Sequence, residues 1–116
     1  MRKGDIVRGR ITIHPIIFLR RLNLEQFVGC LLTHSNDSEY PDNIELRPEH
    51  FLHHDRAGIQ YQTQYDNSYL VAIELIKDLD WGPFTKTGQL SQEGIFFVED
   101  QLQVLEPQKW EDYLTN

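Results

Sequence analysis

The chain has 116 residues, of which 40% are hydrophobic and 25% charged, and its formal net charge is −7 at pH 7. This length suits one domain with its own core, so we expect a single domain over residues 1–116. The single cysteine, Cys30, excludes a disulfide framework within the chain. The acidic balance argues against broad, nonspecific nucleic-acid binding.

Charge is distributed unevenly along the sequence. The first 21 residues hold six basic side chains against Asp5, which makes this segment +5 and the remainder −12. A basic patch at the start of the chain can hold a phosphodiester, or its side chains can simply pair with acids elsewhere. We find neither a signal peptide nor the roughly 18 apolar residues of a spanning helix, so we expect a cytoplasmic protein without a membrane partner.

The first predicted strand covers residues 6–13 and ends at the pair His14-Pro15. Apolar residues fall on one face of this strand. Arg8 and Arg10 fall on the other face, about 7 Å apart at strand spacing. This segment therefore predicts two guanidinium groups side by side on an exposed face.

The next segments are less uniform. Residues 16–26 leave two alternatives open, a short helix or a long excursion between strands. The apolar run 27–33 predicts a buried strand, in which we interpret Cys30 as a small core side chain and not a nucleophile. Turn-forming residues predict a loop over 35–43, and 43–51 reads as a short strand that its proline limits to an edge or a break.

The clearest predicted hairpin pairs residues 59–65 with residues 69–76. The first of these segments alternates between larger side chains and glutamines, and the second is nearly all apolar. Asp66-Asn67 between them suits a two-residue turn, because both residues tolerate left-handed backbone angles.

A helix is predicted near the end of the chain. Ser91 suits the N-cap, Glu93 suits the first turn, and Pro107 ends the helix. A packing stripe is formed by Ile95, Val98, Leu102 and Leu105. The elements together predict a mainly β protein with a strongly bent antiparallel sheet and a C-terminal helix.

Three segments, in this order, resemble the MazF/PemK/Kid toxin family. Gly4 to Val7 (GDIV) is similar to the opening of the family's first strand, and residues 28–37 (VGCLLTHSND) look like its second-strand segment. Residues 68–105 resemble the end of the family, with an Ile-Lys-x-Leu-Asp close at 76–80 and the spacing Lys-x-Gly-x-Leu-Ser at 86–91. The resemblance implies a small SH3-like antiparallel barrel with a C-terminal helix. It also implies a homodimer, a paired antitoxin and sequence-selective cleavage of single-stranded RNA without metal or cofactor, and no DNA partner.

The chain departs from the family at the positions that carry catalysis. Where the family opens its second strand with an Arg-Pro pair, this chain has Phe27-Val28. Where the family has a Thr-Ser site, the comparable stretch here is Arg47-Pro48-Glu49-His50. Neither family catalytic residue carries over by position, so other side chains would have to do this work.

Cleavage of RNA needs a base for the 2′-hydroxyl, an acid for the leaving oxygen and cations for the phosphorane. His50 and His34 are our candidates for proton transfer, because histidine titrates near neutral pH. The arginines supply the cations: Arg21 as a catalytic residue, with phosphate binding assigned to Arg8, Arg10 and Arg20.

Other interpretations remain open. The histidines at 50, 53 and 54 with the aspartate at 55 have a metal-like spacing, but no distant ligand completes a tetrahedral site, so we expect no metal. Our leading interpretation is a toxin of the toxin-antitoxin type, or a diverged relative, that acts as an endoribonuclease. The alternative is a noncatalytic protein-interaction module of the same fold. A subunit of a larger assembly is a third alternative.

Overall fold

The structure of the chain is a computed structural model that describes residues 1–10, 14–33, 43–61, 63–65, 68–71, 73–102 and 108–109. The strands are β1 (Asp5–Arg8), β2 (Ile16–Arg21), β3 (Gln26–Thr33), β4 (Ile44–Glu45), β5 (Phe51–Leu52), β6 (Tyr69–Leu70), β7 (Leu75–Asp78), β8 (Thr85–Leu90) and β9 (Gln108–Lys109). The helical elements are the 3-10 turns η1 (Pro48–His50) and η2 (Leu79–Trp81) and the α-helix α1 (Gln92–Gln101). No helix in this described part is long and apolar enough to cross a membrane.

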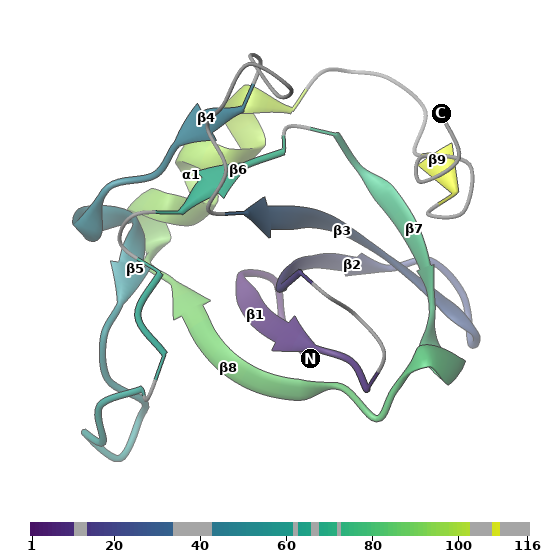
Figure 1. Cartoon of the computed structure of the whole chain (residues 1–116), viewed down its shortest axis with the longest axis horizontal. Helices are drawn as coiled ribbons and strands as arrows, with labels where there is room; N and C mark the ends of the chain where they lie inside the picture. Colours follow the sequence, from purple (N-terminus) through teal and green to yellow (C-terminus); the bar gives the residue numbers. More distant parts are fainter. Residues whose placement is uncertain are drawn as a thin grey trace.

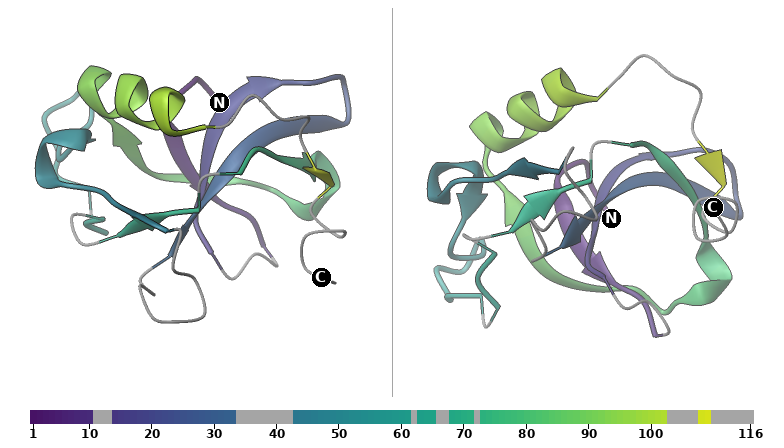
Figure 2. Two further views of the ribbon diagram at one scale, coloured as in Figure 1. Left: turned by 90° about the horizontal axis from the view of Figure 1, so that it is seen from above. Right: turned by 45° about the horizontal axis from the view of Figure 1, so that its top comes forward.

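The strands form one curled sheet (Figure 1). Its order is β4-β6-β3-β2-β1-β8-β5, all antiparallel, and β7 pairs with the first half of β3. The short β9 adds a parallel edge to β7. The views in Figure 2 show α1 lying over one end of the sheet. The predicted fold class is confirmed: the protein is mainly β, with a curled antiparallel half-barrel and a C-terminal helix, compatible with a small SH3-like barrel.

Residues 16–26 form neither of the two predicted alternatives. They are strand β2 and a tight turn into β3, with Ile17 opposite Cys30. Asn23 shapes the turn, because its side-chain oxygen accepts a hydrogen bond from the Glu25 backbone at 2.8 Å. The Leu22 backbone then donates to the Gln26 carbonyl at 3.0 Å and closes the hairpin.

The sheet is covered on both faces by apolar side chains. Ile17 and Leu19 of β2 enter one cluster together with Val98 of α1, whereas Ile16 and Phe18 enter a second cluster. Because both faces are buried, residues 16–19 of β2 and 27–32 of β3 are apolar runs without alternation. Cys30 is buried in the first cluster, as expected, and burial raises the pKa of its thiol to about 12.

The predicted hairpin between residues 59–65 and 69–76 is wrong. β6 pairs instead with β3 and β4, and β7 pairs with β3, so the predicted second strand is divided between two places in the sheet. The described residues of the segment 59–65 form only an isolated bridge, from Gln60 to His54, and Ile59 is 65% exposed despite the alternation around it. The expected turn at 66–67 lies outside the described residues.

Other boundaries also differ from the sequence predictions. β1 ends at Arg8, and residues 11–13 of the longer predicted strand are outside the described part of the chain. β8 was not predicted because its sequence, TKTGQL, is polar and contains glycine. It is a strand because it pairs with β1 along one edge and β5 along the other. The segment 43–51 is divided into β4, η1 and the start of β5.

The predicted N-terminus of the helix is confirmed. Ser91 is the N-cap of α1, and its side-chain oxygen accepts a hydrogen bond from the Gly94 backbone at 3.0 Å. Val98 is buried, and Ile95 and Leu102 pack against the first cluster. The helix ends at Gln101, before the predicted stop at Pro107; that proline, Leu105 and most of the predicted loop 35–43 lie outside the described residues.

Candidate functional site

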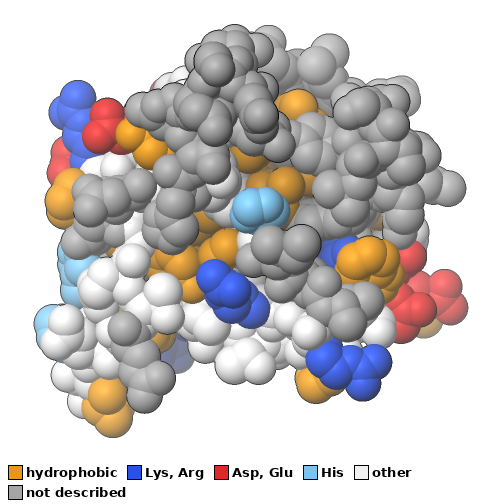
Figure 3. Space-filling view, in the orientation of Figure 1, with side chains coloured by type: hydrophobic (Ala, Val, Ile, Leu, Met, Phe, Trp, Pro, Cys, Tyr) orange, Lys and Arg blue, Asp and Glu red, His pale blue; other side chains and the backbone are white. Residues whose placement is uncertain are grey.

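Arg8 and Arg10 are exposed, as the sequence predicts. Arg8 ends β1 and lies opposite Thr85 of β8. Arg10 lies beyond the strand, with its backbone nitrogen bonded to the Trp81 carbonyl at 3.2 Å, so regular strand spacing does not extend from one arginine to the other. Figure 3 shows the lysine and arginine side chains of one face standing apart from one another.

Arg20 and Arg21 already have partners within the fold. Arg20 donates two hydrogen bonds to the Glu74 carboxylate, at 2.8 and 3.0 Å, and these bonds raise the pKa of its guanidinium. The Arg21 side chain donates to the Asn23 carbonyl in the β2–β3 turn at 3.0 Å. A phosphate would therefore compete with internal contacts at both residues.

His50 has the surroundings of a core side chain. It is 6% exposed, and its ring stacks on Phe97 of α1 with the ring centroids 4.3 Å apart. Its Nδ1 accepts a hydrogen bond from the Arg47 backbone at 3.0 Å, and the Arg47 carbonyl accepts one from the His50 backbone at 2.9 Å. This reciprocal pair closes η1, so His50 holds the turn against the helix.

The predicted residues occupy separate parts of the sheet. Arg20 is on β2, whereas β5 directly follows His50, and β1 and β8 lie between these two strands. Three strand spacings correspond to about 14 Å along the sheet. His34, the other candidate for proton transfer, lies outside the described residues. Among those that are described, no group of three histidine, cysteine, aspartate or glutamate side chains is placed to hold a metal ion.

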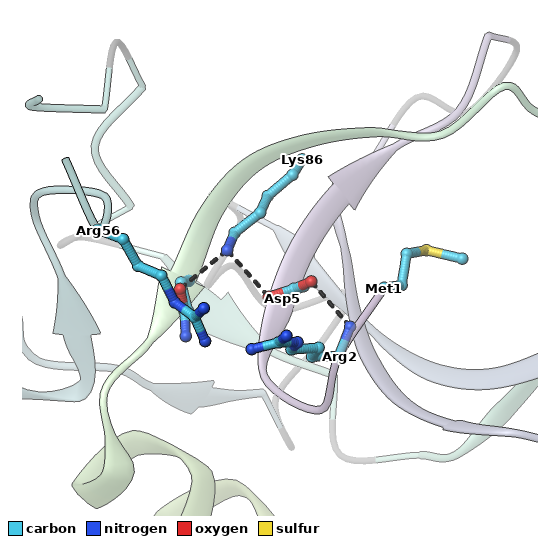
Figure 4. A pocket seen from close by; sticks show the side chains of 6 residues that line it. Met1, Arg2, Asp5, Arg56 and Lys86 are labelled. Carbon is cyan, nitrogen blue, oxygen red and sulfur yellow. Dashed lines mark hydrogen bonds and ion pairs between the residues drawn. The ribbon is translucent and has the colours of Figure 1, made fainter.

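A cavity of about 310 Å³ lies beside the start of β1, and we call it the basic pocket (Figure 4). It is lined by Met1, Arg2, Asp5, Arg56, Lys86 and Gln89. The buried Asp5 carboxylate accepts a hydrogen bond from the Arg2 backbone at 2.8 Å through one oxygen and lies 3.2 Å from the Lys86 ammonium through the other. Lys86 also donates to the Gln89 side chain at 2.9 Å.

An irregularity in the pairing of β1 with β8 builds this pocket. Ile6 lies opposite Gly88 but Val7 lies opposite Lys86, so Thr87 is an extra residue in β8. In a regular strand, residues three apart point to opposite faces. The bulge places Lys86 and Gln89 on the same face, where their side chains meet.

A second cavity, of about 510 Å³, lies between the β2–β3 turn and η2, and we call it the acidic groove. It is lined by Leu24, Glu25, Asp78, Leu79 and Asp80. A hydrogen bond of 2.7 Å from the Leu79 backbone to the Glu25 carbonyl ties its two walls together. Leu24 is 88% exposed, which is unusual for a large apolar side chain beside three carboxylates. Figure 3 shows acidic side chains at two places on the rim of this face, the lower right and the upper left.

Lys77 is a buried cation on β7. Its ammonium lies over the ring of Trp81, 2.8 Å from the ring centroid. A lysine over an indole face is stabilised by the ring's quadrupole. Trp81 and Phe84 of the turn after β7 pack against the second apolar cluster.

Sequence reasoning did not find the basic pocket or the acidic groove. Arg2 and Arg56 are 54 positions apart, and no spacing rule relates them. The one local signal was the Gly4-Asp5 pair before β1. Gly4 has a φ of +92°, which turns the chain so that Asp5 accepts the Arg2 backbone hydrogen bond.

Comparisons with known proteins do not identify a family. No protein-family model matches the chain, and no curated protein sequence matches it. The resemblance to the MazF/PemK/Kid family therefore rests on the residues quoted above and stays a hypothesis.

Proposed function

We propose that this chain is a noncatalytic protein-interaction module on a MazF/PemK-like barrel. One observation carries the proposal: His50, the one described histidine that we expect to transfer protons, is stacked on Phe97 and bonded to the Arg47 backbone. A general base must reach the proton that it removes. A buried ring that closes a turn is poorly placed for that role.

The arginines support the same conclusion. The Arg20 side chain donates hydrogen bonds to Glu74, and the Arg21 side chain donates one to the Asn23 carbonyl in the turn. Charge stabilisation of a phosphorane relies on cations already aimed at it, without internal bonds to break. The alternative proposal, a sequence-selective endoribonuclease with an antitoxin and a homodimeric form, would depend on His34 together with Arg8 and Arg10.

The acidic groove is the surface that we assign to the partner. Leu24 offers an exposed apolar contact, and Glu25, Asp78 and Asp80 surround it with negative charge and no basic side chain in the lining. An interface of this kind favours an apolar anchor with a charged rim of opposite sign on the partner. We therefore infer a partner segment that combines apolar and basic side chains.

We expect the purified chain to leave single-stranded RNA intact and His50→Ala to act on stability instead. Loss of the stacked ring and of its hydrogen bond should lower the free energy of unfolding by about 2–3 kcal/mol in urea titrations. His54→Ala, at an exposed histidine four residues away, is the control and should change it by less than about 0.5 kcal/mol.

The opposite outcome is equally specific. RNA cleavage, or growth arrest on expression, that disappears in Arg8→Ala or His34→Ala while the melting temperature is kept would establish the ribonuclease and overturn the interaction module.

The groove itself is tested with a synthetic peptide of alternating lysine and leucine. We expect saturable NMR shifts at residues 24–25 and 78–80, and none with the same peptide carrying glutamate in place of lysine. Asp80→Asn should weaken binding several-fold, because it removes an exposed carboxylate of the groove. The control Asp100→Asn removes an equal charge from α1 and should leave binding unchanged. If both variants weaken peptide binding equally, the effect comes from net charge, and the groove is not the binding site.

A further inference from the structure

The basic pocket carries more positive charge than its own acid offsets. Arg2, Arg56 and Lys86 bring three positive charges to its lining, and Asp5 brings one negative charge. The lining is therefore +2 on a chain whose net charge is −7. A local excess of positive charge on a negatively charged protein attracts an anion to that one place, because the rest of the surface repels it.

Two of these cations face each other without an acid to pair with. Figure 4 shows Arg2 and Arg56 extending from opposite sides toward the same space. Among the described residues, neither guanidinium forms an ion pair or a side-chain hydrogen bond. The two positive charges repel each other in the empty site. An anion between them would be attracted by both, so the net electrostatic energy of the site would become favourable.

The third cation is held in place before any ligand arrives. Asp5 and Gln89 fix the Lys86 ammonium at 3.2 and 2.9 Å, and the bulge at Thr87 sets the direction of the side chain. The ammonium has three donors, of which Gln89 takes one and Asp5 is met as an ion pair, so at least one donor remains for a ligand. A site with one positioned donor loses less side-chain entropy on binding than a site of three mobile cations.

We propose that the basic pocket binds the phosphate group of a phosphate monoester. A dianionic phosphate matches the +2 lining, and its oxygens suit the fork of donors that each guanidinium presents. The cavity of about 310 Å³ corresponds to roughly ten water volumes. It therefore has room for the phosphate and for part of the group attached to it. The proposal uses no residue of the acidic groove and does not rest on the proposed protein interaction.

The test is an NMR titration of the full chain with inorganic phosphate, with adenosine 5′-monophosphate and with adenosine, at constant ionic strength. We expect saturable backbone shifts at residues 2, 5, 56, 86 and 89 with the two phosphate-bearing probes and none with adenosine. Arg56→Gln and Arg2→Gln should each weaken binding about tenfold, the effect of one charge-assisted hydrogen bond. Both side chains are exposed, so the variants should keep the fold.

Arg21→Gln is the matched control, because it removes the same charge from an exposed arginine outside the pocket. It should bind phosphate as the original chain does. Tighter binding of the nucleotide than of inorganic phosphate would identify a nucleotide as the source, and equal binding would identify the phosphate group alone; either result supports the site. Absence of saturable shifts, or equal weakening in Arg21→Gln and Arg56→Gln, would overturn it.

Discussion

Gly94→Ala is expected to lower the free energy of unfolding by about 2–3 kcal/mol, the cost of overpacking a fitted contact. A Cβ atom at this position would overlap the carbonyl oxygen of His50 and would lie 2.8 Å from its carbonyl carbon. That oxygen already accepts the Ser91 backbone hydrogen bond at 2.9 Å, which joins α1 to η1. Urea unfolding followed by circular dichroism measures the change.

The sign of the change in the free energy of unfolding distinguishes helix propensity from tertiary packing as the dominant effect. In a helix without tertiary contacts, replacing glycine by alanine stabilises by about 1 kcal/mol. Here we expect the reverse, because the obstacle is a backbone group that cannot turn aside. Gln92→Ala, at an exposed position of the same helix, should stay within about 0.5 kcal/mol of the original chain. A stabilised Gly94→Ala would mean that α1 does not pack closely on η1.

The elements whose prediction is correct are those that residues close together in the sequence specify. The Ser91 cap lies within three residues of the backbone group that it accepts from. The buried strand β3 is a short apolar run with the valine and aromatic content that strands favour. Residues 16–19 carry a shorter apolar run, for which the sequence leaves a helix and an excursion open. Only pairing with β3 decides that they are a strand, and Asn23 was the overlooked signal of the turn.

The misplaced hairpin and the overlooked pocket have one physical origin, which is long-range strand pairing. The sequence prediction pairs the segment of β6 and β7 with the strand nearest in sequence, yet both pair with β3, which lies 36 to 52 positions earlier. The basic pocket depends in the same way on the pairing of β1 with β8 across 84 positions at Asp5 and Gln89. Strand partners of this kind are chosen by burial of whole faces, which short windows of sequence do not contain.

Phe27→Ala is expected to have the largest effect, a loss of about 3–5 kcal/mol in the free energy of unfolding. Phe27 has 0% exposure and lies in the second apolar cluster. Its ring centroid is 5.5 Å from that of Phe18 and 5.2 Å, edge to face, from that of Phe84. Deleting the ring removes both contacts and leaves a cavity against β7. If Phe27→Ala fails to fold, Phe27→Leu should still fold, with a smaller loss of about 1–2 kcal/mol.

Phe96→Ala is the matched control, since it removes the same ring from a side chain that is 63% exposed, and it should cost less than about 1 kcal/mol. Phe27 also stands where the MazF/PemK resemblance places a catalytic arginine. A guanidinium in this apolar cluster would be buried without a designed partner, which is far more costly than the cavity. We therefore expect Phe27→Arg to unfold the chain, whereas a folded Phe27→Arg that cleaves RNA would mean that this part of the barrel opens to solvent and that the nuclease architecture is intact.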